Sequence, residues 1–515
     1  FRQLNDSRSN SLERGEFSFS GAYSGQAFAD FLLGRADEAT RALGTSRQDL
    51  RSREFELGIS DEWRIHERLT LTLGLAYHYY GPFRSTRGNI SVFRPLLFEP
   101  PPDGGLVDLG SGNSELGQSF VPTVVEPDRN DFAPRIGLAY RPFGSGRIVL
   151  RASYGIYYEP IASWLYENYM GRNYPYYYQQ SSEASIDSVG LDLGSPFETA
   201  TPTELTIRDI SSDLSTPYGQ NWDIRLQNEL TDHWNLELSY RGRRSVHQVR
   251  IIPANVPLPG AGEIQRRRPN SEYGRFSIVT GGGSSLFYEF QTDLRRRFEN
   301  GFTFDVAFEW RRAFNDSFDD YPSNPRDLRA EWAPSEGMRS RRLRFNYILE
   351  LPFGEGRAFG KVPAVDFLLG GWRFSGIAEI MSGQVFSVLL PGDPNNDGLS
   401  NDRPDRLNTG NLEGGQQSID RWFDTEAFGY PEPYGFGNAG RNILLGPGLH
   451  NWDMSLIKDF VLSNDHRFEI RFAFFNAFNH TNFENPDSVF GTRTFGVISG
   501  AGRAREIEIA LKYSF

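Results

Sequence analysis

The sequence predicts an all-β fold, a transmembrane antiparallel β-barrel, from three observations. Apolar and polar residues alternate along long segments, the connections between these segments alternate between short and long, and aromatic residues gather toward the segment ends. From Leu69 to Tyr79, for example, the odd positions are Leu or Tyr and the even positions are small or polar. Alternation alone fits both a soluble sandwich and a membrane barrel, so strand length and connections must decide between them.

The alternating segments are long. A strand in a globular protein has about 5–6 residues, whereas a strand tilted across a bilayer needs about 9–11. About 14 segments qualify, and most exceed the globular length. The expected strands are 17–22, 51–63, 67–81, 131–142, 147–159, 218–231, 233–249, 283–298, 301–314, 338–352, 368–389, 450–462, 465–482 and 502–515.

The connections follow the outer-membrane pattern, in which periplasmic turns are tight and extracellular loops are long. One connection on the short side, 353–367, is longer than the others. An even number of strands is expected to leave both ends of the chain on the periplasmic side. The short turns fall near 64–66, 143–146, 232, 300–301 and 462–465, and the long loops are 82–130, 160–217, 250–282, 315–337, 390–449 and 483–501.

Composition and net charge further limit the class of protein that this chain can belong to. The chain has 515 residues, a formal net charge of −12 and no cysteine, and its mean hydropathy is −0.50. No stretch approaches the roughly 18–20 apolar residues of a transmembrane helix. The acidic charge argues against a nucleic-acid binder, and the absence of cysteine excludes a disulfide framework. Because the chain begins FRQLND without a methionine, we expect a mature or excised piece.

Six sequence blocks occur in a fixed order along nearly the whole chain. They are FSGAYSGQAFADFLLG (19–34), DEWRIHERLTLTLGLAYHYYGP (61–82), DFAPRIGLAYRPFGSGRIVLRASYGIYYEP (131–160), PYGQNWDIRLQNEL (217–230), FGNAGRNILLGPGLHNWDMSLIKDF (436–460) and RFEIRFAFFNAFNHTNF (467–483).

Together these blocks resemble the Oar-like TonB-dependent receptors of the bacterial outer membrane. Members of that family consist of a carboxypeptidase-regulatory-like domain, a plug and a 22-stranded barrel. This sequence has no recognisable plug or TonB box, so the resemblance implies that residues 1–515 are the C-terminal portion of the barrel.

The resemblance also implies the function, the location and the partners. The expected function is TonB-dependent transport of a large or scarce nutrient of the siderophore, glycan or peptide class. The expected location is the bacterial outer membrane, in contact with lipid and lipopolysaccharide. The barrel-assembly machinery and, through segments outside this chain, TonB are the expected protein partners.

The motif DPNNDG (393–398) resembles the opening of an EF-hand calcium loop, in which oxygen ligands at alternate positions wrap one cation and glycine permits the turn. The twelfth position is Pro404 instead of glutamate, so a further ligand must come from a nearby aspartate. A polar turn without metal is the alternative. The candidate ligands for a structural Ca²⁺ are Asp393, Asn395, Asp397, Asp402 and Asp405.

Aromatic residues are dense in the segment 160–217. Aromatic rings can stack on sugars and other flat ligands, but they can equally pack on one another to fold a large loop. The candidate ligand-binding residues are Trp164, Tyr166, Tyr174, Tyr176, Tyr177 and Tyr178.

No catalytic motif stands out, and we expect no enzyme and no required cofactor. The seven histidines lack metal-ligand spacing, and neither a nucleophile elbow nor a P-loop is present. The glycines at 435, 437 and 440 match G-x-G-x-x-G, but the Gly-Pro-Gly at 446–448 argues against the helix that a dinucleotide site needs.

The chain ends in the alternating strand EIEIALKYSF (506–515), and its Tyr513 and Phe515 resemble the signal read by the barrel-assembly machinery. Two other functions remain open at this point. One is a self-contained 14-strand channel or adhesion barrel, and the other is a secreted all-β carbohydrate-binding protein. A closed barrel would favour the first, and a buried aromatic face would favour the second.

Overall fold

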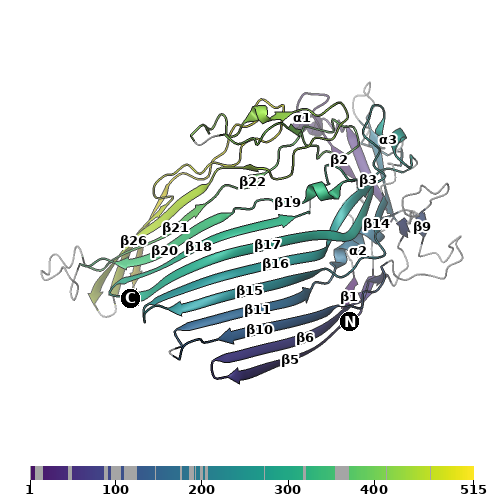
Figure 1. Ribbon diagram of the computed structural model, residues 1–515. Helices are drawn as coiled ribbons and strands as arrows, with labels where there is room; N and C mark the ends of the chain where they lie inside the picture. The colour runs from purple at the N-terminus through teal and green to yellow at the C-terminus, as the bar shows by residue number, and fades with distance from the viewer. Residues whose placement is uncertain are drawn as a thin grey trace.

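A computed structural model gives the fold (Figure 1). It describes residues 2–5, 15–44, 49–85, 91–93, 106–108, 125–144, 146–173, 177–184, 191, 193–197, 201–202, 207–271, 273–316, 321–353, 370–412, 415–463 and 466–515.

One large curved sheet dominates the molecule, as Figure 1 shows. It has 15 strands, of which all but β14 (Ile207–Ile210) and β19 (Ala333–Pro334) follow one another along an antiparallel path. The path is, in chain order, β5 (Glu54–His66), β6 (Leu69–Tyr80), β10 (Phe132–Tyr140), β11 (Ile148–Tyr158), β15 (Tyr218–Glu229), β16 (Trp234–Ala254), β17 (Phe276–Glu299), β18 (Phe302–Asn315), β20 (Arg341–Glu350), β21 (Trp372–Met381), β26 (Leu449–Ser463), β27 (His466–Phe475) and β28 (Glu506–Ser514).

The predicted alternation of connections is confirmed. Asn300 and Gly301 join β17 to β18 with positive φ angles of 52° and 79°, which is the backbone that a two-residue hairpin turn requires. Segments of more than 20 residues leave the opposite rim, for instance between β6 and β10 and between β21 and β26. We call these edges of the wall the short-turn rim and the long-loop rim.

The predicted barrel strand 17–22 is wrong. Glu16–Ser18 forms the short strand β2, which belongs to a separate sheet with β3 (Glu38–Gly44), β12 (Tyr177–Glu183) and β13 (Thr201–Pro202). Gly21, at φ 89°, then turns the chain into helix α1 (Ala27–Leu32), so the alternation cannot continue. The path therefore contains 13 strands instead of 14. With an odd number, β5 starts at the long-loop rim, and the expectation that both ends lie on the short-turn side fails for the N-terminal end.

The pairing register separates the two faces of the sheet cleanly. One row of paired residues across β11, β15, β16, β17 and β18 is Ala152, Ile224, Tyr240, Phe290 and Trp310. The adjacent row, on the other side of the sheet, is Ser153, Asp223, Arg241, Glu289 and Arg311. We name these sides the apolar face and the polar face.

No part of the chain that the structure describes covers the apolar face. Ile224 is 49% exposed, Tyr240 41% and Trp310 43%. A soluble sandwich would bury such a row in its core, and an exposed apolar surface of this extent needs lipid to cover it. The exposure thus favours the membrane barrel over the soluble protein.

The sheet has two edges. Among the described residues, β5 pairs only with β6, and β28 pairs only with β27. The wall is therefore curved but not closed (Figure 1).

Strands β16 and β17 run beyond the wall toward the long-loop side. Their ladder continues past two register shifts, at Ser245/Gln248 and Gln248/Arg250, to the pair Ala254–Phe276. His247, which lies at these shifts, has a left-handed backbone conformation with a φ of 56°. The predicted strands 233–249 and 283–298 were therefore too short, because the extension carries three consecutive glycines, Gly281 to Gly283, that resemble a loop.

Three small hydrophobic clusters lie on the long-loop side of the described structure, and the smallest is Ile207 on β14 against Phe276 on β17. Another surrounds helix α2 (Ser163–Met170) and includes Leu50, Phe83 and Val279. The third lies in the segment between β21 and β26. The remaining elements are β1 (Arg2–Asn5), β4 (Asp49–Ser52), β7 (Arg84–Ser85), β8 (Ser91–Phe93), β9 (Leu106–Asp108), α3 (Ile264–Arg267), η1 (Leu328–Glu331), β22 (Val385–Phe386), β23 (Asp405–Arg406), η2 (Thr425–Ala427), β24 (Phe428–Gly429) and β25 (Leu444–Leu445).

Helices contribute little to the fold. None of them, in the part of the chain that the structure describes, is long and apolar enough to cross a membrane.

Candidate functional site

The polar face of the wall carries arginine–carboxylate pairs that link neighbouring strands. Arg241 Nη2 on β16 lies 2.6 Å from Glu289 Oε1 on β17, and Glu289 is almost fully buried. Arg225 Nε on β15 lies 3.2 Å from Glu237 Oε1 on β16. Similar pairs are Arg295–Asp305 at 3.1 Å, Arg342–Glu379 at 2.5 Å and Arg373–Asp459 at 3.0 Å.

These pairs make the face polar without concentrating one sign of charge on it. Each arginine lies beside a carboxylate from the next strand, so the charges compensate locally. The partly exposed pairs, Arg225–Glu237, Arg295–Asp305, Arg342–Glu379 and Arg373–Asp459, add little stability, because water screens them. Their consequence is chemical: the face presents guanidinium, carboxylate and amide groups to whatever fills the space beside it.

Above this wall, four long connections pack into one body. They are 255–275, 321–340, 382–448 and 476–505, and we call them the loop assembly. Its core contains Phe423, whose ring meets those of Phe428 and Phe495 edge-on at centroid distances of 6.0 and 5.0 Å. The rings come from two different connections, so the core joins the loops that follow β21 and β27.

A buried ion pair joins the loop 321–340 to the loop 382–448. Arg403 contacts Glu331, and their side chains are 6% and 2% exposed. Glu331 Oε1 also accepts a hydrogen bond of 3.1 Å from the backbone N–H of Ser323. Nearby, Asn401 Nδ2 donates to the carbonyl oxygen of Tyr321 at 2.6 Å. Sequence reasoning missed this pair, because its members are 72 residues apart and neither belongs to a motif.

The glycine motif at 435–440 serves packing. No helix follows it among the described residues, and the chain instead reaches β25. A Cβ atom at Gly437 would overlap the carbonyl oxygen of Arg403 and the backbone of Pro404. The glycine therefore lets two backbone segments approach each other closely.

We expect Gly437→Ala to destabilise the loop assembly by about 1–3 kcal/mol, because backbone must move to make room. Gly429→Ala is the matched control, since a Cβ there meets only the Leu407 side chain at an ordinary 3.9 Å. Limited proteolysis within 385–445, with the wall intact, measures the difference. Equal protection of the two variants would contradict the prediction.

The acidic turn lies inside the loop assembly. Asn395 is 1% exposed, Asp397 is fully buried and Asp402 is 4% exposed. Asn395 Nδ2 donates to Asp402 Oδ1 at 2.5 Å, so these residues of the predicted set come together. Asp405 does not join them directly, because its Oδ1 accepts a 3.0 Å hydrogen bond from the backbone N–H of Asn438.

The carboxylates of this turn are not arranged as a finished metal centre. Within the described residues, no three acidic or histidine side chains already surround one point that could hold a metal ion. The oxygens of Asp393 instead accept from the backbone N–H groups of Asp397 and Gly398, at 3.0 and 2.6 Å.

The predicted aromatic platform is divided between core and surface. Tyr166 is 2% exposed and packs edge-on against Phe83 at 5.0 Å, so it offers no ring to a ligand in solution. Tyr177, on β12, is also buried, whereas Trp164 is 51% exposed. Tyr178 lies on β12, paired with Leu43. Tyr174 and Tyr176 lie outside the described residues.

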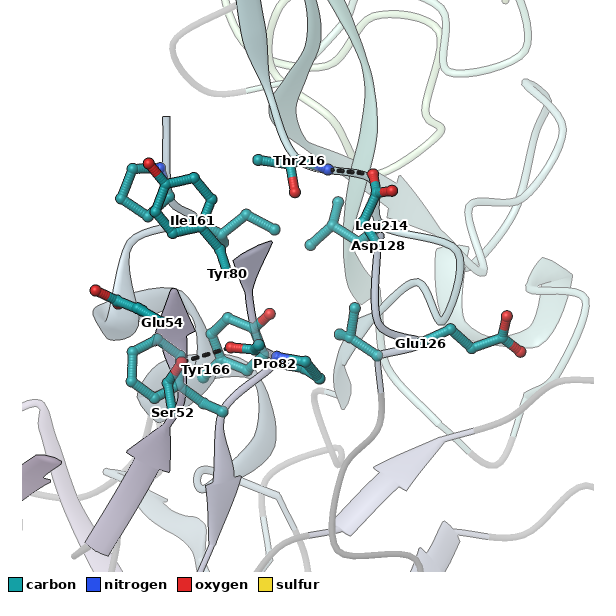
Figure 2. A pocket seen from close by; sticks show the side chains of 14 residues that line it. Ser52, Glu54, Tyr80, Pro82, Glu126, Asp128, Ile161, Tyr166, Leu214 and Thr216 are labelled. Atoms are coloured by element: carbon teal, nitrogen blue, oxygen red, sulfur yellow. Dashed lines mark hydrogen bonds between the residues drawn. The ribbon is translucent and has the colours of Figure 1, made fainter. Parts of the chain in front are cut away.

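A cavity of about 20 Å³ lies beside Tyr166, between the ends of β4 and β6 and the segments 125–128 and 214–216. In Figure 2, Ser52 Oγ donates to the carbonyl of Gly81 at 2.5 Å, and the Thr216 N–H donates to Asp128 Oδ2 at 3.1 Å. This volume has room for about one water molecule, so the cavity is too small for a nutrient.

Tyr513 and Phe515 lie on an open surface at the short-turn end of β28. Phe515 is 90% exposed, and its ring stacks on that of Tyr513 at 5.7 Å. The Tyr513 hydroxyl lies 2.7 Å from His466 Nδ1. Both aromatic residues remain the predicted assembly signal.

A family model described as outer membrane beta barrel domain matches residues 1–508. No curated protein matches the chain.

Among solved structures, the chain is similar to the ferripyoverdine receptor of Pseudomonas aeruginosa, with 10% identity, a TM-score of 0.42 and coverage of 91% of this chain and 39% of the receptor. It is also similar to the FrpB iron transporter of Neisseria meningitidis, with 12% identity, a TM-score of 0.43 and coverage of 91% and 46%. It is likewise similar to the siderophore receptor PiuA of Acinetobacter baumannii, with 8% identity, a TM-score of 0.41 and coverage of 93% of this chain and 44% of the receptor. The chain thus spans less than half the length of each of these proteins.

Proposed function

The chain belongs to the outer membrane beta barrel domain family and is an integral protein of the bacterial outer membrane, and from this premise we propose that it forms the wall and outer mouth of a TonB-dependent transporter. In this proposal the apolar face contacts lipid, the polar face lines the lumen, and the loop assembly lies on the extracellular side. The short-turn rim is then periplasmic.

The observation that carries the proposal is the compensated charge of the polar face. Its arginine–carboxylate pairs run from β15 to β26, with every pair on the side opposite the apolar face. A lumen with this lining can be hydrated and can pass polar cargo, because no single sign of charge holds the cargo back. In this proposal, segments outside this chain form the plug and make the contact with TonB that supplies the energy for transport.

The proposed cargo is a large or scarce nutrient of the siderophore, glycan or peptide class. The interlocked loop assembly supports capture of such a cargo before it enters the lumen, because it presents a folded surface at the long-loop rim. Trp164, which is exposed, can stack on a flat or sugar-like group.

A self-contained channel or adhesion barrel is the second candidate. It requires β5 to pair with β28, and both edges are free of such pairing in the described structure. The transporter therefore has the stronger support. The secreted carbohydrate-binding protein is wrong, since the family match makes the chain an outer-membrane barrel and the aromatic face is uncovered.

We predict that uptake through the product of the complete gene requires TonB. Cells carrying the gene should accumulate a member of a radio-iron-loaded siderophore panel or a fluorescent glycan or peptide panel. Deletion of tonB should reduce that accumulation to the level of cells without the gene. Uptake that is unchanged in the tonB deletion would instead identify a passive channel.

A further inference from the structure

The acidic turn of the loop assembly contains buried carboxylate oxygens without partners. Asp397 is fully buried and Asp402 is 4% exposed, yet Oδ2 of each has no hydrogen-bond partner. Among the described residues, neither forms an ion pair, and Asp393 forms none either. The other oxygen of each carboxylate accepts one hydrogen bond, from the N–H of Leu399 at Asp397 and from Asn395 at Asp402. A buried carboxylate with one oxygen unsatisfied is expensive, and native proteins compensate it with a proton, a cation or a partner.

The arginines around the turn are engaged elsewhere. Arg267 donates to the carbonyl oxygens of Leu258 and Asn396, and Arg326 donates to that of Val256 at 2.7 Å. Arg403 contacts Glu331 and the carbonyl of Ala439. These three guanidinium groups attract the carboxylates from a distance, but none of them is hydrogen-bonded to Asp397 or Asp402.

We propose that Asp393, Asp397 and Asp402, with the side-chain oxygen of Asn395, bind a divalent cation, with calcium preferred. All four can supply the hard oxygen ligands that Ca²⁺ prefers. The backbone wraps around the turn because Asn396 and Gly398 take left-handed φ angles of 57° and 86°. Because no three acidic groups of the described residues yet surround one point, binding requires these carboxylates to reorient around the cation.

The cation would hold two loops together. Asn396 Nδ2 donates to the carbonyl oxygens of Gly260 and Gly262 at 2.7 and 2.8 Å, and the N–H of Gly260 donates to the carbonyl of Asn395 at 3.1 Å. The acidic turn is therefore the part of the β21–β26 loop that contacts the β16–β17 loop. A cation at the turn makes this contact dependent on calcium, and its place at the outer mouth rests on the proposed function.

The test uses the protein purified in detergent, treated with EDTA and returned to either Ca²⁺ or Mg²⁺. Without a divalent cation, cleavage within 390–412 and 255–271 should be faster than in the presence of calcium. Calcium should bind with measurable heat and suppress the cleavage, and magnesium should do so less.

Asp402→Asn keeps the shape of the side chain and removes its charge. We expect this variant to lose at least about tenfold in calcium affinity, because one charged oxygen ligand is removed. Asp420→Asn, an exposed aspartate in the same connection, is the matched control and should bind as the unmodified chain does.

Protection of the loops that neither cation changes, or equal affinities of the Asp402→Asn variant and the unmodified chain, would overturn the proposal. The measurement needs no cargo, so a failed TonB experiment and a failed calcium experiment are distinguishable.

Discussion

Replacing Ala152 with arginine is expected to destabilise the folded barrel by about 2–4 kcal/mol, whereas the same replacement at Ser153 is expected to leave it nearly unchanged. The two residues are neighbours near the centre of β11 and differ in the face they occupy. Ala152 pairs with Ile224 in the apolar row, and Ser153 pairs with Asp223 in the polar row. An arginine at 152 would enter hydrocarbon, while one at 153 would enter a hydrated lumen beside a carboxylate.

Heat-modified migration and urea unfolding of the complete protein in lipid vesicles measure the difference. The paired design controls for loss of strand propensity and for added bulk, because both variants introduce the same side chain one position apart. Equal destabilisation by the two variants would contradict the assignment of the faces. A larger effect at Ser153 would show that the polar face, and not the apolar face, contacts lipid.

Replacing Arg403 with methionine is expected to lower the free energy of unfolding of the loop assembly by about 3–5 kcal/mol. The change leaves the Glu331 carboxylate buried at 2% exposure with only the Ser323 N–H to compensate it. Hydrogen exchange of the backbone amides in 321–340 and 385–445 should accelerate, while exchange in β15 to β18 should stay slow. The wall is held by its own ladders and does not depend on this pair.

Two further variants separate the ion pair from mere loss of volume. Arg403→Met combined with Glu331→Gln should recover most of the protection, because no uncompensated charge then remains. Arg266→Ala should change the free energy of opening, as measured by hydrogen exchange, by less than about 1 kcal/mol. The reason is that the pair of Arg266 with Glu263 is largely exposed. Failure of the double variant to recover would show that the packing of the arginine stem, and not the charge, holds the loops.

The wall was predictable from sequence because the alternation of apolar and polar residues is visible within each strand. Alternation assigned Leu236 and Glu237 to opposite faces, and the Asn300–Gly301 pair marked a hairpin without reference to the rest of the chain. Predictions failed where the local pattern was short or ambiguous. The segment 17–22 alternates over too few residues to fix a strand, and Gly281 to Gly283 resemble a loop although they continue a ladder.

The loop assembly was less accessible to sequence reasoning, because its contacts join distant residues. The DPNNDG motif identified a polar turn, but nothing in it indicates that Asn396 bonds to Gly260, 136 residues away. Tyr166 entered the predicted platform on composition alone, and only the packing of helix α2 against Phe83 shows it to be core. Glu331 and Arg403 look like surface residues until the fold brings them together.

The unpaired edges of the sheet have a consequence for handling the isolated protein. Along β5 and β28, every second backbone N–H and C=O points away from the only partner strand. Water or detergent headgroups can satisfy these groups, but hydrocarbon cannot, and each one left unsatisfied there costs several kcal/mol. In a bilayer the edges must therefore join each other or a further strand. Copies of this chain alone, concentrated in micelles, should self-associate edge to edge through the same groups.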